Sequence, residues 1–449
     1  MATTGEPEAL RVRMGAIRHL EAAGACGLVA LLARPAVADE DVIAFDGDDA
    51  VVAATNGCVT LEQPAAHAAS AAVVGHYKTH LHLDGLARLP LSVARELARH
   101  RGHLYLDGLA TITPAVAAEL AAHVAGGISL NKLRRLRAPV AAALGRHGGE
   151  LSLNGLSRLE SAAAAGLAPH AHELYLDGVA GLSPGAAAAL SLHSGDLFLG
   201  GLARLTPRVA RHLARHRGIL HLHSVTELGC GAAAALGRRR GALCLKNVRR
   251  LSPRQAAGIA RHVGPLQMYA VEVDDVVAGC LGRHAGSLMI RVPDDLPCGR
   301  LVALVQHRGP LGLVGLRTLD EGRAVVLAAQ PLLHGVAGLS GVFLDDVERI
   351  SPATAAILAG HRAGGLSLRG VRILSEDVAA ALVRHPLLSL DGVTSVTDRV
   401  AAILATHAGA SLSLRGLEHV SGPALTRLRE NPGIDLPRRL VAAGGRTAR

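Results

Sequence analysis

Histidine recurs at a nearly constant interval along most of the chain, and a column of imidazoles could do chemistry. Half of the 24 histidines belong to this column, namely His100, His123, His147, His170, His193, His216, His262, His284, His307, His361, His385 and His407. Neighbouring imidazoles could share a metal ion or relay a proton. A metal site, however, is built from a few converging ligands of mixed type, whereas this column repeats one residue type. We therefore interpret the column as structural, with each ring near a helix C-terminus where it can bond to unpaired carbonyl oxygens.

Two short motifs resemble catalytic or ion-binding sequences without supporting such a role. Residues 181–185 match the nucleophile-elbow pattern G-x-S-x-G. Ser183, however, occupies the same slot before a proline as Thr113 and Thr206, which is typical of a helix N-cap. Residues 46–49 (DGDD) are too few for a calcium loop. The sequence therefore predicts no catalytic residue, no metal site and no cofactor, and hence no enzyme.

The histidines follow a repeat that organises the chain between residues 80 and 431. The run Leu81-His-Leu83-Asp-Gly85-Leu86 returns in close or looser copies. Its first leucine-like residue falls at positions 81, 104, 128, 151, 174, 197, 220, 243, 266, 288, 311, 342, 366, 388 and 412. Successive copies begin 22 to 24 residues apart, except for one interval of 31. A fixed period of this size predicts a solenoid of fifteen stacked units, here called rungs.

Within a rung, numbered from the first leucine as position 0, the residue types predict a strand, a loop and a helix. Positions 0 and 2 are apolar, as in a short strand, and strands of successive rungs must pair in parallel. Position 4 is glycine in nine of the fifteen rungs, which favours a turn with positive φ. Positions 5 and 8 are apolar and suit a loop tucked inward. Ser or Thr before Pro at positions 9 and 10 starts a helix of about three turns, with its buried stripe at positions 13 and 16.

The rung pattern L-x-L-x-x-(L/V)-x-x-L-(S/T)-x-x-x-A-x-x-L-A resembles a leucine-rich repeat. It is nearest to the cysteine-containing subtype, with a shorter unit of 23 residues. The resemblance implies a right-handed α/β solenoid curved into a horseshoe, with a parallel sheet on the concave face and short helices on the convex face. It also implies a role in protein binding, which in this family commonly uses the concave face.

The repeat divides the chain into three parts. Residues 1–56 do not follow the period and are predicted to be an N-terminal capping region. Residues 57–432 form the predicted solenoid, which is irregular at 264–341 and carries an insertion at 331–341. Residues 433–449 are predicted to be a basic C-terminal tail.

The N-terminal part is expected to be helical at 8–23 and 25–33, and the second stretch raises the question of secretion. It is apolar and is followed by Ala36-Val37-Ala38, which resembles a cleavage site. The segment before it is long and acidic for a signal peptide, so we interpret the run as a capping helix. The six cysteines form no C-x-x-C pair, which is typical of reduced thiols. We therefore expect a cytoplasmic protein, with secretion as the alternative and no membrane span.

Positions 1 and 3 point away from the helices, and most aromatic residues lie at these two positions. Five of the seven Phe and Tyr residues do so, and His221 joins them; the five are Tyr105, Tyr175, Phe198, Tyr269 and Phe343. Exposed aromatic side chains are common anchors of binding surfaces, so these residues are predicted to contact a partner. The alternative is lateral stacking that stabilises the sheet by about 0.2–1 kcal/mol per pair.

Charge on the same face is segregated along the chain. At position 3, Asp84, Asp107 and Asp177 precede Lys246 and Arg291. An acidic region followed by a basic region suits a protein partner better than a uniform polyanion, so these five residues complete the predicted binding surface. The alternative is turn chemistry, because Asp-Gly commonly ends a strand.

The sequence thus predicts a non-enzymatic scaffold that binds a protein partner on its concave face. The alternative is a basic solenoid that binds nucleic acid, since the formal net charge is +10. Arginine recurs at position 7, at residues 88, 135, 158, 204, 250 and 349, and it also flanks the histidines, as at 238–240. Such arginines could form a rim that follows phosphates, or simply a solvated edge.

Overall fold

The computed structural model describes residues 80–123, 126–329, 341–361 and 364–442, and the backbone of three strands at 40–44, 51–55 and 58–61. The predictions for residues 8–38, 46–49, 331–340 and 443–449 lie outside these ranges. The contacts divide the chain into two compact units. Unit 1 comprises residues 1–203 and 215–223, and unit 2 comprises residues 204–214 and 224–449.

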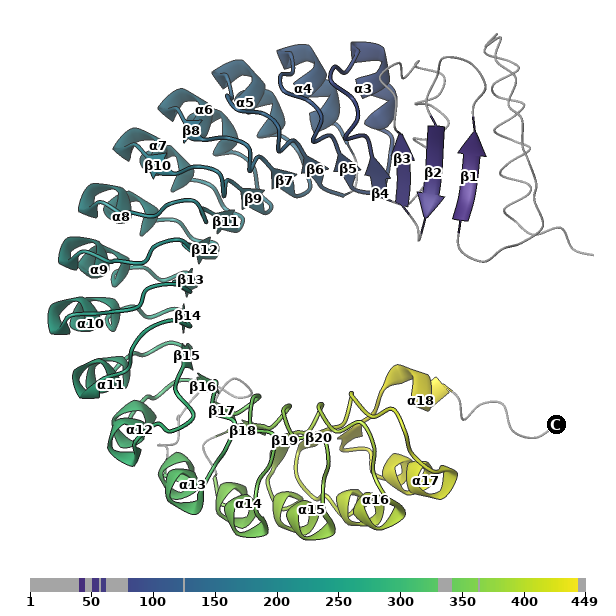
Figure 1. Cartoon of the computed structure of the whole chain (residues 1–449), viewed down its shortest axis with the longest axis vertical. Coiled ribbons are helices and arrows are strands. Elements are labelled where there is room, and N and C mark those ends of the chain that lie inside the picture. The colour runs from purple at the N-terminus through teal and green to yellow at the C-terminus, as the bar shows by residue number, and fades with distance from the viewer. Residues whose placement is uncertain are drawn as a thin grey trace, which may run out of the picture. The chain divides into compact units, whose positions relative to one another are not determined.

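Unit 1 contains a sheet whose parallel strands are joined by helices that line one side of it (Figure 1). The parallel strands are β3 (Cys58–Leu61), β4 (His80–His82), β5 (Leu104–Tyr105), β6 (Ile128–Ser129), β7 (Leu151–Ser152), β9 (Leu174–Tyr175), β11 (Leu197–Phe198) and β12 (Leu220–His221). The helices are α3 (Leu91–Leu97), α4 (Pro114–Ala121), α5 (Ala138–Leu144), α6 (Ser161–Leu167) and α7 (Pro184–Leu190). First leucines of successive rungs pair with each other, for example Leu151 with Leu174, which confirms the predicted parallel register.

An antiparallel hairpin extends the N-terminal edge of this sheet. β1 (Glu40–Ala44) pairs with β2 (Val51–Thr55), and β2 pairs with β3, both antiparallel. β3 in turn runs parallel to β4, with Val59 opposite Leu81, so Cys58–Leu61 is the strand of a first, degenerate rung, as the sequence indicates. A separate pair of short parallel strands, β8 (Arg158–Leu159) and β10 (Gly181–Leu182), joins two neighbouring loops.

Unit 2 repeats the same plan. Its parallel strands are β13 (Leu243–Cys244), β14 (Leu266–Met268), β15 (Leu288–Arg291), β16 (Leu311–Val314), β17 (Gly341–Phe343), β18 (Gly365–Ser367), β19 (Leu387–Ser389), β20 (Ser411–Ser413) and β21 (Ile434–Asp435). Its helices are α8 (Pro207–Leu213), α9 (Cys230–Leu236), α10 (Pro253–Ile259), α11 (Asp275–Leu281), α12 (Cys298–Val305), α13 (Glu321–Ala328), α14 (Pro352–Ala359), α15 (Glu376–Leu382), α16 (Asp398–Ala405), α17 (Gly422–Glu430) and α18 (Arg438–Ala442). One strand, β21, thus follows Asn431, where the repeat pattern ends in the sequence.

The stretch in which the sequence pattern weakens keeps its strand register. Leu266, Leu288 and Leu311 pair in succession. The strands are longer here than in the preceding rungs: β15 and β16 each have four residues, whereas β13 has two. Position 4 is Ala270 after β14 and Val292 after β15, whereas Gly315 (φ 93°) follows β16. The irregularity at 266–314 is therefore a longer strand rather than a break in the stack.

The core of each rung is filled by the positions that the sequence marks as apolar. In the rung that begins at Leu104, the side chains of Leu104, Leu106, Leu109, Ala117 and Leu120 are all 0% exposed. They come from the strand, the loop and the helix of one rung, so each rung contributes a thin apolar layer. Because one layer buries little area, stability depends on stacking against the neighbouring rungs.

Hydroxyl N-caps begin many of the helices, as predicted. The side-chain oxygens of Thr113, Ser183 and Thr206 accept hydrogen bonds from the backbone N–H three residues later, over 3.3, 3.1 and 3.3 Å. Ser183 is therefore engaged as a cap, in agreement with the dismissal of a catalytic serine. The predicted helix length is wrong, because α3 to α17 contain seven to nine residues, which is about two turns. The chain turns off after position 16, and the N–H of His123 bonds back to the Leu120 carbonyl over 3.0 Å.

The glycines at position 4 are required for a different reason from the one the sequence suggested. Among the described residues, positive φ occurs at Gly126, Gly315 and Gly364, and only Gly315 (φ 93°) is at position 4. At Gly155, a Cβ atom would lie 1.9 Å from the carbonyl oxygen of Asn131 in the preceding rung. Close approach between rungs, rather than a left-handed turn, therefore selects glycine here.

We expect Gly155→Ala to lower the free energy of unfolding by about 1–3 kcal/mol, the usual cost of overpacking a rigid site. The added methyl would have to displace the backbone of the neighbouring rung. Gly148→Ala is the matched control, because no atom lies within 4 Å of a Cβ built there. Urea titrations followed by circular dichroism measure both changes. Equal stability of the two variants would contradict the close-approach explanation.

Candidate functional site: an aromatic and acidic strand face

The side of the sheet away from the helices, here called the strand face, carries positions −1, 1 and 3 of each rung. Of the predicted binding residues, Tyr105, Tyr175, Phe198, His221, Asp84, Asp107 and Asp177 belong to unit 1, and Lys246, Tyr269, Arg291 and Phe343 belong to unit 2. Each group is described within its own unit. Position −1, immediately before the first leucine, was not considered in the sequence prediction and proves to be part of this face.

The first aromatic cluster in unit 1 surrounds Tyr105. The ring of Tyr105 stacks on His82 with centroids 4.1 Å apart and planes 2° from parallel. His103, at position −1 of the same rung, stacks on it at 4.3 Å. All three side chains are half-buried, so they pack laterally and still reach the surface.

The second cluster is a stack of three rings on neighbouring strands. Tyr175 lies 4.2 Å from Phe198, and Phe198 lies 3.9 Å from His221, measured between ring centroids. The planes are 16° and 4° from parallel. The Nδ1 atom of His221 lies 3.3 Å from Nε2 of His223, which fixes the end of the stack. The stacking alternative from the sequence is thus confirmed, and the half-buried rings remain accessible for a partner.

Carboxylates surround the Tyr175 end of this stack. Burial raises the pKa of the Tyr175 hydroxyl, and the negative charges of Glu150, Glu173, Asp177 and Asp196 raise it further. Three of these four residues, Glu150, Glu173 and Asp196, occupy position −1 of successive rungs. Side chains alternate between the two sides of a strand, so position −1 lies on the same side as positions 1 and 3. The alternation seen from the first leucine onward therefore also predicts these three residues on the strand face.

The predicted acidic residues at position 3 have structural partners. Each carboxylate accepts a hydrogen bond from the backbone N–H at position 3 of the next rung. The distances are 3.0 Å for Asp84 with Asp107, 2.7 Å for Asp107 with Asn131, and 2.6 Å for Asp177 with Gly200. These bonds continue the inter-rung hydrogen bonding where the strands end. The residues keep their charge on the strand face, and their role in partner binding stays a prediction.

We expect Asp107→Ala to lower the free energy of unfolding by about 1–3 kcal/mol, because buried donors would lose their acceptor. Asp107 accepts from Asn131 N and from Ser129 Oγ, both over 2.7 Å. Asp107→Asn should cost much less, since Asn131 itself accepts from Asn154 N in the same geometry, over 2.8 Å. Chemical denaturation compares the three proteins. If the alanine variant matched the wild type, the inter-rung bond would have no structural role.

The four predicted residues of unit 2 do not form one cluster. Lys246 is exposed at the end of β13, and Phe343 is 37% exposed on β17. Tyr269 and Arg291 line a common hollow of 1050 Å³ at the ends of β14 and β15. Further along, basic residues at position 3 are paired with acidic ones, as in Arg415 with Asp435 at 2.6 Å. The strand face of unit 2 is therefore mixed in charge.

The column histidines form two buried series, one in each unit. All twelve are at most 4% exposed. Neighbouring rings stack, for example His170 on His193 and His262 on His284, both with centroids 5.6 Å apart. Nδ1 of His170 lies 3.3 Å from Nε2 of His193, so one ring donates and the other accepts, and the accepting imidazole must be neutral.

Ring nitrogens of several of these histidines lie within hydrogen-bond distance of carbonyl oxygens, and of these acceptors Val383, the C-cap of α15, is at a helix end as the sequence predicts. The ring nitrogens of His170, His262 and His407 lie 2.8, 2.9 and 2.9 Å from the carbonyl oxygens of Gly149, Gly241 and Val383. Burial first, and neighbouring histidines second, lower the pKa of His123, His147 and His193 to about 4. These imidazoles are neutral at pH 7 and are packed as part of the core.

Arg239 takes the histidine position in the rung that begins at Leu220. Its side chain is 0% exposed, and its guanidinium donates to the Leu213 carbonyl at 3.1 Å and to the Ala242 carbonyl at 3.3 Å. Leu213 is the last residue of α8, where unpaired carbonyls attract a cation. The interpretation of Arg238–Arg240 as surface residues holds for Arg238 and Arg240 but is wrong for Arg239.

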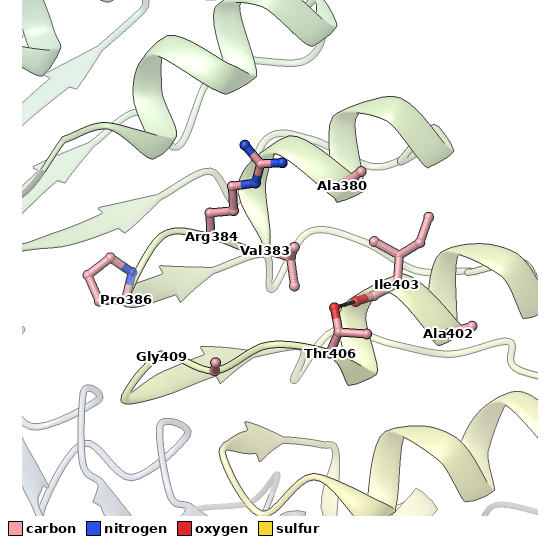
Figure 2. Close-up of a pocket in the computed structure, with 9 residues that line it drawn as sticks. Ala380, Val383, Arg384, Pro386, Ala402, Ile403, Thr406 and Gly409 are labelled. Atoms are coloured by element: carbon pink, nitrogen blue, oxygen red, sulfur yellow. Dashed lines mark hydrogen bonds between the residues drawn. The ribbon is translucent and has the colours of Figure 1, made fainter.

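The helix side of unit 2 offers a second hollow, between α15 and α16, with a volume of 730 Å³ (Figure 2). Its walls are largely apolar, with Ala380 from α15, Val383 directly after that helix, and Ala402 and Ile403 from α16. Thr406 is satisfied internally, because its hydroxyl donates to the Ile403 carbonyl over 2.7 Å. Arg384 is the single charged group at its edge, so the hollow lacks a set of groups that could carry out a reaction.

Cys230, Cys244, Cys280 and Cys298 are free thiols. Within the described ranges, none of the helices combines the length and the apolar character that a membrane crossing would need.

The arginines at position 7 are exposed at the loop edges, and Arg250 forms an ion pair there with Glu272 at 3.2 Å.

Comparison with known proteins gives distant structural likeness. No protein-family model and no curated protein matches the chain. Solved structures similar to it include a chain of the Toll–Spatzle complex of Drosophila, with 13% identity, a TM-score of 0.37 and 97% of this chain covered. A leucine-rich-repeat protein of Leptospira interrogans has 15% identity and a TM-score of 0.38, with 83% of this chain and 99% of that chain covered. An internalin of Listeria monocytogenes has 14% identity and a TM-score of 0.33, with 77% and 88% covered.

The chain spans 58% of the length of the Toll–Spatzle chain that it matches. The fold itself is established by the chain's own rungs, in which leucines at positions 0 and 2 are buried and successive strands pair in register. By these features the chain is an α/β solenoid of the leucine-rich-repeat type.

Proposed function

We propose that the chain is a non-enzymatic scaffold that binds a protein partner on the strand face of unit 1. The stack of Tyr175, Phe198 and His221 carries this proposal, because three half-buried rings lie side by side on the face of the sheet away from the described helices. Aromatic side chains bury a large area and have few rotatable bonds, so they are effective anchors for a partner. Two of the groups that the sequence singles out for possible chemistry have structural roles, because the column histidines fill the core and Ser183 caps α7.

Affinity capture from the source cells, after nuclease treatment, tests this proposal. The wild type is compared with the double variant Tyr175→Ala/Phe198→Ala and with Leu192→Ala, which removes a 76% exposed apolar side chain beside α7. We expect a specific protein to be retained by the wild type and by Leu192→Ala, and to be lost from the double variant. Circular dichroism confirms that each variant is folded.

Two outcomes would contradict the proposal. Retention of the same protein by the double variant would remove the stack from the binding surface. Loss of all bound material after nuclease, with no effect of the double variant, would instead assign binding of nucleic acid to the exposed arginines at position 7.

A further inference from the structure

The strand face of unit 1 is acidic although the chain as a whole is basic. Between His80 and His223, positions −1, 1 and 3 of the rungs carry six carboxylates and no lysine or arginine. The carboxylates belong to Asp84, Asp107, Glu150, Glu173, Asp177 and Asp196. The formal net charge of the chain is +10, so its basic side chains lie elsewhere. A face with this composition has a negative potential that attracts cationic groups and repels polyanions.

Two serine rungs separate the two aromatic clusters on this face. Position 1 is Tyr105 in β5, Ser129 in β6, Ser152 in β7 and Tyr175 in β9, and these strands are successive neighbours. With strands about 4.8 Å apart, the two tyrosines lie about 14 Å from each other. Because serine is short, the ring of Tyr175 has an aromatic neighbour, Phe198, on one side and only Ser152 on the other. The face of Tyr175 toward the serine rungs, here called its open face, therefore has no ring of the described residues stacked on it.

Carboxylates lie on both sides of this open ring face. Glu150 and Glu173 precede β7 and β9 at position −1, and Asp177 follows β9 at position 3. Glu173 and Asp177 are each two residues from Tyr175 along the chain and so share its side of the sheet, and Glu150 directly precedes the paired strand β7. Glu150 is exposed, and Glu173 and Asp177 are half-buried, which leaves each of them accessible to a ligand. An aromatic face bordered by negative charge is the arrangement that binds ammonium and guanidinium groups.

We infer that this acidic–aromatic patch, comprising Tyr175, Ser152, Glu150, Glu173 and Asp177, binds an extended arginine- or lysine-rich segment of the protein partner. The inference rests on the proposed function and specifies the chemistry of the partner. A guanidinium stacks on the open face of Tyr175 and donates charge-assisted hydrogen bonds to the glutamates. In an extended segment, side chains two residues apart point the same way and are about 6–7 Å apart. A neighbouring cationic side chain can therefore reach the carboxylates around the serine rungs while the first remains on Tyr175.

Matched peptides test the role of the cation. The probe is a fluorescein-labelled nonapeptide in which arginine alternates with serine, and the control replaces each arginine with citrulline, which has the same shape and no charge. Fluorescence anisotropy with the full chain should show binding of the arginine peptide and at least about tenfold weaker binding of the citrulline peptide. Binding of the arginine peptide should also weaken as salt is raised. Equal binding of the two peptides, or binding of neither, would overturn the inference.

Matched variants test the location. Tyr175→Leu keeps apolar bulk but removes the π face, and should weaken binding about tenfold. Glu150→Gln/Glu173→Gln should weaken it at least as much. The control Glu119→Gln/Glu160→Gln removes the same net charge from α4 and the residue before α6, and should change binding less than about twofold, because screened charges elsewhere contribute little. Equal effects of the two double variants would show attraction to overall charge and overturn the assignment to this patch.

Failure of this inference is distinguishable from failure of the proposed function. If the arginine peptide does not bind but Tyr175→Ala/Phe198→Ala still loses its captured protein, the strand face remains the binding surface and only the cationic chemistry of the partner is refuted. If the double variant keeps its captured protein, the proposed function itself fails.

Discussion

The folded chain is expected to unfold over a narrow acid range, with a midpoint near pH 5. By that pH, the free energy of unfolding lost through its buried imidazoles should have offset an ordinary folding stability of about 5–15 kcal/mol. The cause is the histidine column. Burial first, and neighbouring histidines second, lower the pKa of His284 to about 3 and that of His385 to about 4. An unfolded histidine titrates near 6.5. Below that pH the histidines of the unfolded chain become protonated, whereas the buried histidines of the folded core remain neutral.

The sign and size of the effect follow from proton linkage. A histidine with a lowered pKa in the folded state stabilises the fold fully above pH 6.5, and this stabilisation is lost as the pH falls toward about 4. Each such residue removes about 1.4 kcal/mol per pH unit in that window. Unit 1 contains three column histidines whose pKa is lowered to about 4, at 123, 147 and 193. Together they remove about 4 kcal/mol per pH unit.

Urea titrations at pH values from 7.5 to 5, chosen to bracket the histidine pKa, measure this slope. His284→Asn provides a matched variant, because Asn431 occupies the same column position at the end of the stack. Its side-chain amide donates to the carbonyls of Ala405 and His407 over 2.9 and 2.7 Å. The variant should have a smaller slope by about 1.4 kcal/mol per pH unit. A free energy of unfolding that stays constant across this range would refute the account of the column.

Arg239→Ala is expected to lower the free energy of unfolding by about 3–5 kcal/mol, as for removal of other large buried side chains. The guanidinium fills a core position and donates to the carbonyls of Leu213 and Ala242. Its loss would leave both a cavity and buried acceptors without donors, and each of these is costly.

The neighbouring arginines provide the controls for this variant. Arg238 and Arg240 are exposed on either side of the buried Arg239, so Arg238→Ala and Arg240→Ala should change stability by less than about 0.5 kcal/mol. Arg239→His should lie between the alanine variant and the wild type, because the position accepts an imidazole in most rungs. Thermal and urea unfolding would compare the four variants with the wild type. Similar losses at all three arginines would show that burial of Arg239 has no special role.

Most of the fold could be predicted from the sequence, because each structural position has the same type of residue in many successive rungs. Leucines at positions 0 and 2 fix both the buried face and the register, and pairs such as Leu151 with Leu174 follow from the period alone. The caps Thr113 and Thr206 could be predicted because a hydroxyl residue directly before proline is typical of the first residues of a helix.

The errors concern contacts between rungs, which a pattern within one rung does not contain. Gly155 was assigned a positive φ, but it is glycine because the Asn131 carbonyl of the preceding rung leaves no room for a Cβ. The helices end about one turn early because the chain must return to the sheet within a period of 23 residues. Arg239 appeared to be one of three surface arginines, and only its place in the histidine column distinguishes it.

The candidate site was predicted in part. The sequence placed Tyr175 and Phe198 on the strand face, and the structure brings them into one stack with His221. It did not include Glu150 and Glu173, because both residues precede the first leucine of their rungs. The interpretation of an acidic region followed by a basic one was incomplete for the same reason, because the acidic region contains twice as many carboxylates as position 3 alone suggested.

Site-specific photo-cross-linking tests the central claim, that the strand face of unit 1 binds a protein partner, most directly. A photoreactive phenylalanine analogue at Tyr175 would report contacts of the strand face. The same analogue at Ala188, on α7, would report contacts of the helix side. We expect a discrete cross-linked protein from position 175 and none from position 188, with the cross-link suppressed by Phe198→Ala. Cross-linking from position 188 alone would contradict the account and move the interaction to the helices.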